Sequence, residues 1–253
     1  MRTHALPLFA VLALLTGCGG LNLSTGELGN LNYSLHSDFV VDQLDLTQVS
    51  ILAGHAQSFG ASLTDQGEDR FPDAEDDATW SHEVTPSAGV TVSGDDDVPS
   101  FALTVTEPGE YVVESSADGE LVDRITLTFD VPTSLDGVTW VRPPNAEDFV
   151  KVEAATAQVD EGAQAAFVPI PLDADGERIV GDFVPVISAD PAESVVSGLN
   201  VLGIYEQNVV VARSPASVYF IEPGAITVSV SDEVNGLSFD QAFSVAPVAA
   251  PGS

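Results

Sequence analysis

One segment of this chain occurs twice, and the repeat limits the fold more strongly than any other feature. The first copy runs from Glu107 to Pro132, and the second runs from Glu222 to Pro247. Each copy begins with Glu-Pro-Gly and continues with alternating apolar and polar residues. A hairpin signal follows, Asp118-Gly119 in the first copy and Asn235-Gly236 in the second, before another alternating stretch that ends at a proline. This order predicts a repeated β-hairpin.

The repeat extends upstream of these hairpins and is one domain long. Four residues of the first half match four of the second in order: Gly54, Phe59, Asp65 and Gly67 match Gly162, Phe167, Asp173 and Gly176. A self-similar period of this length indicates consecutive copies of one structural unit. We therefore expect two tandem domains, residues 31–132 and 133–247, joined with little slack around Pro132-Thr133-Ser134.

Local patterns between these landmarks favour strands. A period of two, with many Val, Ile, Thr and Phe residues, is present in 100–106, 125–131, 207–213 and 225–230. No stretch of comparable length has a helical period, and 16 prolines with 21 glycines would interrupt most helices. The predicted fold class is therefore all-β, with two β-sandwiches and very little helix.

Several of these turn and strand motifs resemble bacterial immunoglobulin-like domains. The second repeat, residues 159–191, has a glycine before a strand, an Asp-x-x-Gly turn and a later Ser-x-Asp-Pro. The first repeat is more diverged, with Trp80 where the family often has a tryptophan on a central strand. The Glu-Pro-Gly segment of the first repeat, which continues to Tyr111, also resembles the late strands of polycystic-kidney-disease-type and related immunoglobulin-like modules. The resemblance covers roughly residues 38–247 and implies tandem immunoglobulin-like sandwiches. It implies no activity.

The first residues of the chain have the features of an export signal. A basic start precedes an apolar run, Leu6 to Leu15, that is too short to span a bilayer. The following sequence, Leu15-Thr16-Gly17-Cys18, resembles the lipobox of bacterial lipoproteins. That resemblance implies removal of residues 1–17 and lipidation of Cys18, which anchors the protein to a membrane. A plain secretory signal and an uncleaved apolar anchor are the alternatives.

The expected location is the bacterial cell envelope. Residues 18–30 are polar and rich in glycine, which predicts a flexible tether between the lipid and the fold. Glycine after Cys18 is compatible with delivery to the outer membrane, on its periplasmic or its surface face. Residues 248–253 are expected to form a frayed tail.

Charge excludes one class of partner. The chain has 39 acidic and seven basic residues, a formal net charge of −32. Such a surface repels nucleic acid and anionic lipid headgroups, so we expect no nucleic-acid partner. A surface suited to salty surroundings, simple solubility and divalent-cation sites are three explanations for the acidic excess.

The residues that most enzymes need are scarce. Cys18 is the only cysteine, so its lipidation leaves no thiol for catalysis or for a disulfide. His36, His55 and His82 have no metal-binding spacing, and neither a Gly-x-Ser-x-Gly elbow nor a phosphate-binding loop is present. We therefore expect no enzymatic activity. A pair of catalytic carboxylates, as in glycosidases, stays an alternative because acidic residues are numerous.

No cofactor is expected, with Ca²⁺ as the one alternative. Asp173, Asp175 and Glu177 alternate around a glycine turn, a pattern that can present oxygen ligands to Ca²⁺. The turn lacks the remaining ligands of an EF-hand loop, and an exposed turn explains the same residues. The acidic stretches at 68–77 and 95–97 allow the same two interpretations.

The functional prediction is a non-catalytic, lipid-anchored binding, adhesion or spacer module with an unknown protein or glycan partner. A calcium-stiffened spacer and a carbohydrate-active lipoprotein are the alternatives. Trp80 and Trp140 fit either a sugar-stacking platform or core positions, and the core interpretation is favoured. Trp140 lies near the predicted domain boundary, where it can also pack across the junction.

Overall fold

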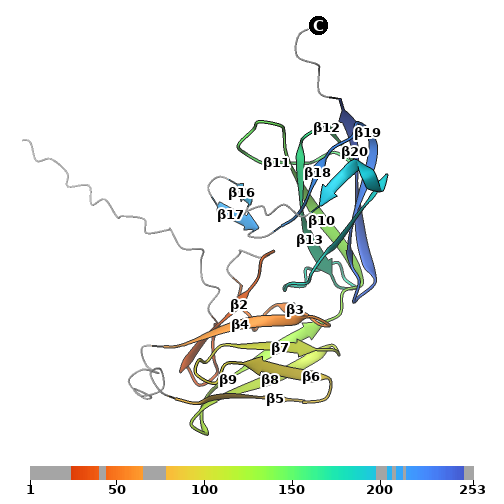
Figure 1. Cartoon of the computed structure of the whole chain (residues 1–253). Coiled ribbons are helices and arrows are strands. Elements are labelled where there is room, and N and C mark those ends of the chain that lie inside the picture. Colours follow the sequence, from red (N-terminus) through yellow and green to blue (C-terminus); the bar gives the residue numbers. More distant parts are fainter. Residues whose placement is uncertain are drawn as a thin grey trace, which may run out of the picture.

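The computed structural model describes residues 24–39, 44–64, 78–197, 204–206, 209–212 and 215–247 (Figure 1). The expected signal peptide, Cys18, the acidic stretch at 68–77 and the tail from residue 248 lie outside these residues. The only helical element among those described is a single 3₁₀ turn, η1 (Ala192–Ser194). None of the described helical structure is long and apolar enough to cross a membrane. The predicted all-β class is therefore confirmed.

Two sheets form the first sandwich. One has the strand order β1-β2-β4-β7-β6, and the other has the order β3-β9-β8-β5. Their bounds are β1 (Ser24–Thr25), β2 (Leu31–His36), β3 (Ser50–Leu52), β4 (Ala56–Leu63), β5 (Trp80–Thr85), β6 (Val90–Gly94), β7 (Phe101–Val105), β8 (Gly109–Ala117) and β9 (Glu120–Asp130). Alternation along β8 buries Tyr111 and Val113 and leaves Val112 and Glu114 half-buried, as expected for a strand with one face on a core.

The second sandwich repeats this arrangement. Its sheets have the orders β11-β10-β13-β18-β15 and β12-β20-β19-β14, and β16 and β17 form a separate hairpin. The bounds are β10 (Ser134–Arg142), β11 (Val150–Lys151), β12 (Thr156–Asp160), β13 (Gln164–Leu172), β14 (Val186–Asp190), β15 (Val195–Ser197), β16 (Ile204–Glu206), β17 (Val209–Ala212), β18 (Ala216–Phe220), β19 (Gly224–Asp232) and β20 (Leu237–Ala246). Phe243 lies at the centre of its core, 4.6 Å from the ring of Phe220 and 6.2 Å from that of Phe167.

The sequence repeat is also a structural repeat. Gly54 and Gly162 have φ values of +84° and +87°, in the left-handed region that favours glycine. Their N–H groups donate to matching carbonyls, those of Val105 and Phe220. Before each glycine, a strand pairs in parallel with the last strand of its domain, β3 with β9 and β12 with β20. Both domains are immunoglobulin-like β-sandwiches, and the chain passes from one to the other between β9 and β10.

The two predicted hairpins are present, but their turns differ in length. Asp118 and Gly119 have φ values of +52° and +82° and join β8 to β9 in a two-residue turn. Residues 233–236 join β19 to β20 in a longer turn. The longer turn contacts the first domain, as described below.

A buried carboxylate fixes the start of the fold. Asp123 on β9 is fully buried and accepts hydrogen bonds from the backbone N–H groups of Leu28, Asn30 and Leu31, at 2.7–2.8 Å. The Asn30 side chain donates to the carbonyl of Val122. Residues 24–30, which the sequence analysis assigned to a tether, thus form β1 and a turn bound to the first sandwich.

We predict that Asp123→Asn destabilises the first domain by about 3 kcal/mol, because an amide group would face N–H donors that now bind a charged acceptor. Chemical denaturation measures the change, and faster amide exchange at residues 28–31 locates it. Glu120→Gln, on an exposed residue of the same strand, is the control. Equal stability of the two variants would contradict the role given to Asp123.

Candidate functional site

The two sandwiches share a hydrophobic core at their junction. Residues of both domains form this cluster: Phe39, Leu52, Leu135, Trp140, Ala166, Val168, Ile179, Phe183, Ile204 and Ala212. The ring of Phe39 lies 5.9 Å from that of Phe183 across the boundary. Trp140 is only 6% exposed in this cluster, and Trp80 is 4% exposed in the core of the first domain. The core interpretation of both tryptophans is confirmed, and Trp140 does pack at the junction.

A segment of the second domain completes the first. The N–H of Leu52 donates to the carbonyl of Val180 at 2.7 Å, and the N–H of Val180 donates to the carbonyl of Ser50 at 2.9 Å. Ile51 and Val180 form a parallel β-bridge. The Val180 side chain is 2% exposed and belongs to the hydrophobic core of the first domain. Residues 178–183 of the second domain therefore add backbone pairing and apolar contact to the first sandwich.

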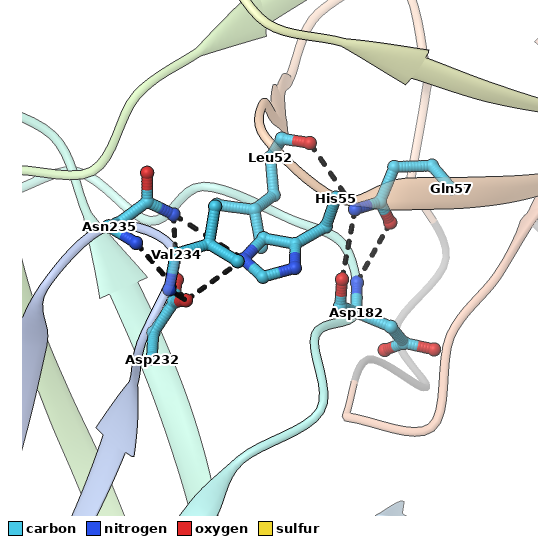
Figure 2. Close-up of polar contacts among 7 residues, drawn as sticks. All are labelled: Leu52, His55, Gln57, Asp182, Asp232, Val234 and Asn235. Atoms are coloured by element: carbon cyan, nitrogen blue, oxygen red, sulfur yellow. Dashed lines mark hydrogen bonds and ion pairs between the residues drawn. The ribbon is translucent and has the colours of Figure 1, made fainter. Parts of the chain in front are cut away.

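A reciprocal amide pair continues this contact (Figure 2). The fully buried Gln57 accepts the N–H of Asp182 through Oε1 at 2.8 Å. Its Nε2 donates to the carbonyl of Asp182 at 3.0 Å and to that of Leu52 at 3.2 Å. The side-chain amide of Gln57 thus bonds both the N–H and the carbonyl of Asp182, as a neighbouring strand would do. The backbone hydrogen-bonding groups of Asp182 therefore have partners at the boundary.

The Asp182 side chain binds the end of β2. Its carboxylate accepts hydrogen bonds from Ser37 Oγ at 2.5 Å and from the N–H of Asp38 at 2.8 Å. Burial raises the pKa of Asp182 above its ordinary value, and repulsion from the Asp38 carboxylate adds to the rise. The hydrogen bonds from Ser37 and Asp38 oppose it.

The long turn between β19 and β20 makes the third contact. Asp232 is 1% exposed and accepts the N–H groups of Val234 at 3.0 Å and Asn235 at 3.3 Å. His55 Nε2 lies 2.9 Å from Asp232 Oδ1, and the imidazole packs against the ring of Phe183 at 5.6 Å. Figure 2 shows this pair beside the Gln57–Asp182 contact. Hereafter, the junction means residues 37–39, 50–57, 178–183 and 232–235.

The predicted calcium ligands lie in a turn with a backbone role. Asp173 Oδ1 accepts the N–H groups of Asp175 at 2.9 Å and Glu177 at 2.8 Å, which closes the turn. The carbonyl of Asp173 accepts a hydrogen bond from Thr133 at the domain boundary. Among the residues that the structure describes, no three His, Cys, Asp or Glu side chains form a group able to hold a metal ion. Calcium binding at Asp173, Asp175 and Glu177 stays a prediction.

A second polar cluster lies inside the first sandwich and was not found in the sequence. Tyr33 donates to Ser115 Oγ at 3.1 Å, and His82 Nδ1 lies 3.0 Å from the same oxygen. The Ser115 hydroxyl can donate to Nδ1 or accept a second hydrogen bond from it, depending on the tautomer of the His82 ring. His82 Nε2 is buried without a hydrogen-bond partner in the described part of the chain. Ser115 is fully buried and His82 is half-buried, so the cluster lies largely within the core of the first domain.

Comparison with known proteins gives fold neighbours alone. No protein-family model and no curated protein sequence matches the chain. Domains 4 and 5 of the S-layer protein SbsC are 13% identical, with 85% of this chain and 97% of that chain covered and a TM-score of 0.29. The Escherichia coli adhesin FdeC is 18% identical, with 88% and 65% covered and a TM-score of 0.30. InvD of Yersinia pseudotuberculosis is 15% identical, with 79% and 56% covered and a TM-score of 0.30.

We predict that Gly181→Ala opens the junction. Gly181 has a φ of +137°, and a Cβ there would lie 2.6 Å from Gln57 Oε1. The expected loss of stability is about 3 kcal/mol from strain and broken hydrogen bonds. Gly176→Ala is the matched control, because Gly176 has a φ of +80° and nothing within 4 Å of the added carbon. It should cost about 1 kcal/mol. Denaturation curves for both variants test the difference, and equal losses would contradict it.

We also predict that His82 makes the first domain sensitive to acid. Burial lowers the pKa of His82 from 6.5 to about 4, so the folded state disfavours the protonated ring. Between pH 6.5 and 4 the unfolded chain therefore binds more protons than the folded chain. The free energy of unfolding of the first domain should fall by about 2–3 kcal/mol as the pH is lowered from 6.5 to 4.

His82→Gln should remove this contribution, which unfolding curves at several pH values measure against wild type. His36→Gln, on an exposed histidine of the same domain, is the control for the substitution itself. Parallel profiles for wild type and His82→Gln would show that His82 does not carry the effect.

Proposed function

We propose that this protein is a lipid-anchored, non-catalytic component of the bacterial envelope whose two domains form one stiff arm. The arm comprises residues 24–247 and either binds a protein or glycan partner or holds attached parts at a fixed distance. The packed junction is the observation that carries the proposal. Domains in tandem move relative to each other by default unless their interface is large and apolar.

Three kinds of contact resist movement at the junction. The shared cluster buries apolar side chains of both domains, and two backbone hydrogen bonds join Val180 to the first sandwich. Side chains then bind backbone groups across the boundary at Gln57 and Asp182. In Figure 1 the strands of the first sandwich run roughly horizontally and those of the second run roughly vertically. The long axes of the two domains therefore differ in direction, so the arm is bent. Its bend is held by these contacts.

A short connection would keep the first domain near the membrane. Ser24 on β1 accepts the N–H of Leu46 through Oγ at 2.7 Å, so Ser24 is attached to the first sandwich. Six residue steps separate Cys18 from Ser24, which limits the extended connection to about 20 Å. With lipid on Cys18, the first sandwich therefore lies close to the bilayer and the second is held by the junction.

Acidic surface charge disfavours partners that are themselves anionic. The net charge of −32 disfavours nucleic acid and anionic headgroups as partners. Recognition on a β-sandwich is most often carried by the loops at its ends. The loops of the second domain away from the junction, residues 143–149 and 221–223, are where we place a protein or glycan contact.

Lipidation is tested by Cys18→Ser. We expect the variant to accumulate as a precursor that keeps residues 1–17 and takes up no labelled fatty acid, because the acceptor thiol is lost. Mass spectrometry of the amino terminus and fatty-acid labelling measure both results. Thr16→Ala keeps a small residue before Gly17 and is the control, which should be processed and labelled like wild type. Labelled, matured Cys18→Ser protein would contradict the anchor.

A further inference from the structure

We propose that the outer face of the second domain around Arg142 binds a sugar that carries a single carboxylate, at the end of an otherwise neutral glycan. The inference rests on the proposed function and deepens it, because Arg142 is the last residue of β10 and directly precedes the loop at 143–149, where we place a protein or glycan contact. It names the chemistry of the ligand at that end of the domain.

Strand pairing brings three polar side chains into one row across the sheet. Arg142 on β10 lies opposite Gln164 on β13, and Gln164 lies opposite Tyr219 on β18 (Figure 1). Residues directly opposite each other on paired strands share a face of the sheet. Their chain neighbours Val141 and Val218 belong to the core between the two sheets. Since successive side chains of a strand alternate between faces, the row lies on the outer face.

The guanidinium of Arg142 is held in a fixed orientation. Its Nη2 donates to Gln164 Oε1 at 2.5 Å and to Tyr219 Oη at 3.3 Å. Its Cζ lies 5.1 Å from the centroid of the Phe149 ring, a cation–π contact. Gln164 is itself 2% exposed and donates through Nε2 to Ser217 Oγ at 3.4 Å. The cation is therefore positioned before a ligand arrives, which lowers the entropic cost of binding.

Arg142 keeps binding capacity that the fold does not use. Both of its hydrogen bonds come from Nη2, and in the described part of the chain neither Nε nor Nη1 donates to an acceptor. None of the ion pairs among the described residues includes Arg142, whereas Arg124 Nε lies 2.6 Å from Glu27 Oε2. A half-buried guanidinium with free N–H groups and no carboxylate partner is complementary to an anionic acceptor from outside the chain.

A second cation lies on the same face. Lys151 on β11 pairs with Trp140, two residues before Arg142 on the same strand, so both basic side chains leave one face of the sheet. Lys151 is the only lysine of the chain. Its Nζ lies 3.8 Å from a carboxylate oxygen of the exposed Glu153, which partly offsets its charge. Arg142 is therefore the better candidate for direct contact with a negative group.

The surroundings select for one negative charge rather than many. Exposed carboxylates flank the row, with Glu147 and Asp148 in the loop after β10 and Glu222 after β18. They repel a ligand with several negative charges, in keeping with the net charge of the chain. A single carboxylate in direct contact with Arg142 gains charge-assisted hydrogen bonds, whereas salt screens its repulsion by carboxylates further away.

The remaining groups fit a sugar ring. Tyr219 offers a hydroxyl beside the guanidinium, and hydroxyl groups of a sugar can donate to it and accept from it. Val196 on β15 lies opposite Tyr219 and is 47% exposed, so the C–H face of a sugar can pack on it. A carboxylate on a ring rich in hydroxyl groups therefore matches the cation, the hydroxyl and the apolar side chain together.

An NMR titration of the full chain tests this chemistry with two sugars that differ in one group. Methyl β-D-glucuronide carries a carboxylate where methyl β-D-glucoside carries a hydroxymethyl group, and sodium chloride keeps the ionic strength equal. The reporters are Arg142 Nε–H, the Gln164 side-chain amide and the backbone N–H of Tyr219. We expect a dissociation constant of about 1 mM for the glucuronide, from the affinity per atom typical of small ligands, and about tenfold weaker binding of the glucoside.

Two variants examine the residues that carry the proposal. Arg142→Gln should weaken glucuronide binding about tenfold, to the level of the glucoside. Tyr219→Phe keeps the ring, removes the hydroxyl and should weaken it about threefold, so the test survives if Arg142→Gln disturbs the fold. Arg124→Gln replaces an ion-paired arginine of the first domain and is the matched control, which should leave the affinity unchanged.

A tripeptide, N-acetyl-Ala-Ala-Ala, carries one carboxylate without a sugar ring and tests the other class of partner. Tighter binding of this peptide than of the glucuronide, or equal binding of the two sugars, would overturn the proposal and leave the protein or glycan contact of the proposed function standing. Unchanged glucuronide affinity in both Arg142→Gln and Tyr219→Phe, or no binding of any probe, would also overturn it. The lipid anchor and the stiff arm have their own tests, which these results do not affect.

Discussion

Val180 belongs to the second domain by sequence and to the first by packing. Its backbone pairs with Ser50 and Leu52, and its side chain lies in the core of the first sandwich. Because this contact completes one domain with a segment of the other, separating the domains would expose apolar surface and break backbone hydrogen bonds at once. The other junction contacts form around it, since Gly181 and Asp182 follow directly in the chain.

Three carboxylates at structurally important positions are held by backbone N–H groups. Asp123 and Asp232 are buried, and each accepts hydrogen bonds from N–H groups of a turn. Asp182 accepts the N–H of Asp38. Such bonds stabilise the charged form of a carboxylate without a paired lysine or arginine. A chain with seven basic residues can therefore place carboxylates inside its fold, where they fix the amino-terminal turn and the domain boundary.

The fold was predictable because its signals are local. Alternation identified strands such as β7 and β19, and Asp118-Gly119 identified a hairpin from two residues. The matched Gly54 and Gly162 gave the domain repeat, since both need the same left-handed backbone. These signals need no knowledge of distant contacts.

The junction was not predictable in this way. Gln57, Asp182 and Asp232 are ordinary surface-type residues in sequence, and their roles depend on partners more than 120 positions away along the chain. One signal was present: the turn at 233–236 is longer than its counterpart at Asp118-Gly119. The extra residues are those that reach the first domain. The anchor at Asp123 was missed for the same reason, so a polar segment bound to β9 was interpreted as a tether.

The central claim is that the two sandwiches move as one body, and ¹⁵N relaxation of residues 24–247 within the full chain at pH 6 tests it most directly. A rigid arm predicts one rotational diffusion tensor that fits the amides of both domains, with a correlation time appropriate to the whole arm. Two tensors, each with the shorter correlation time of a single sandwich, would show that the domains tumble independently and would contradict the account.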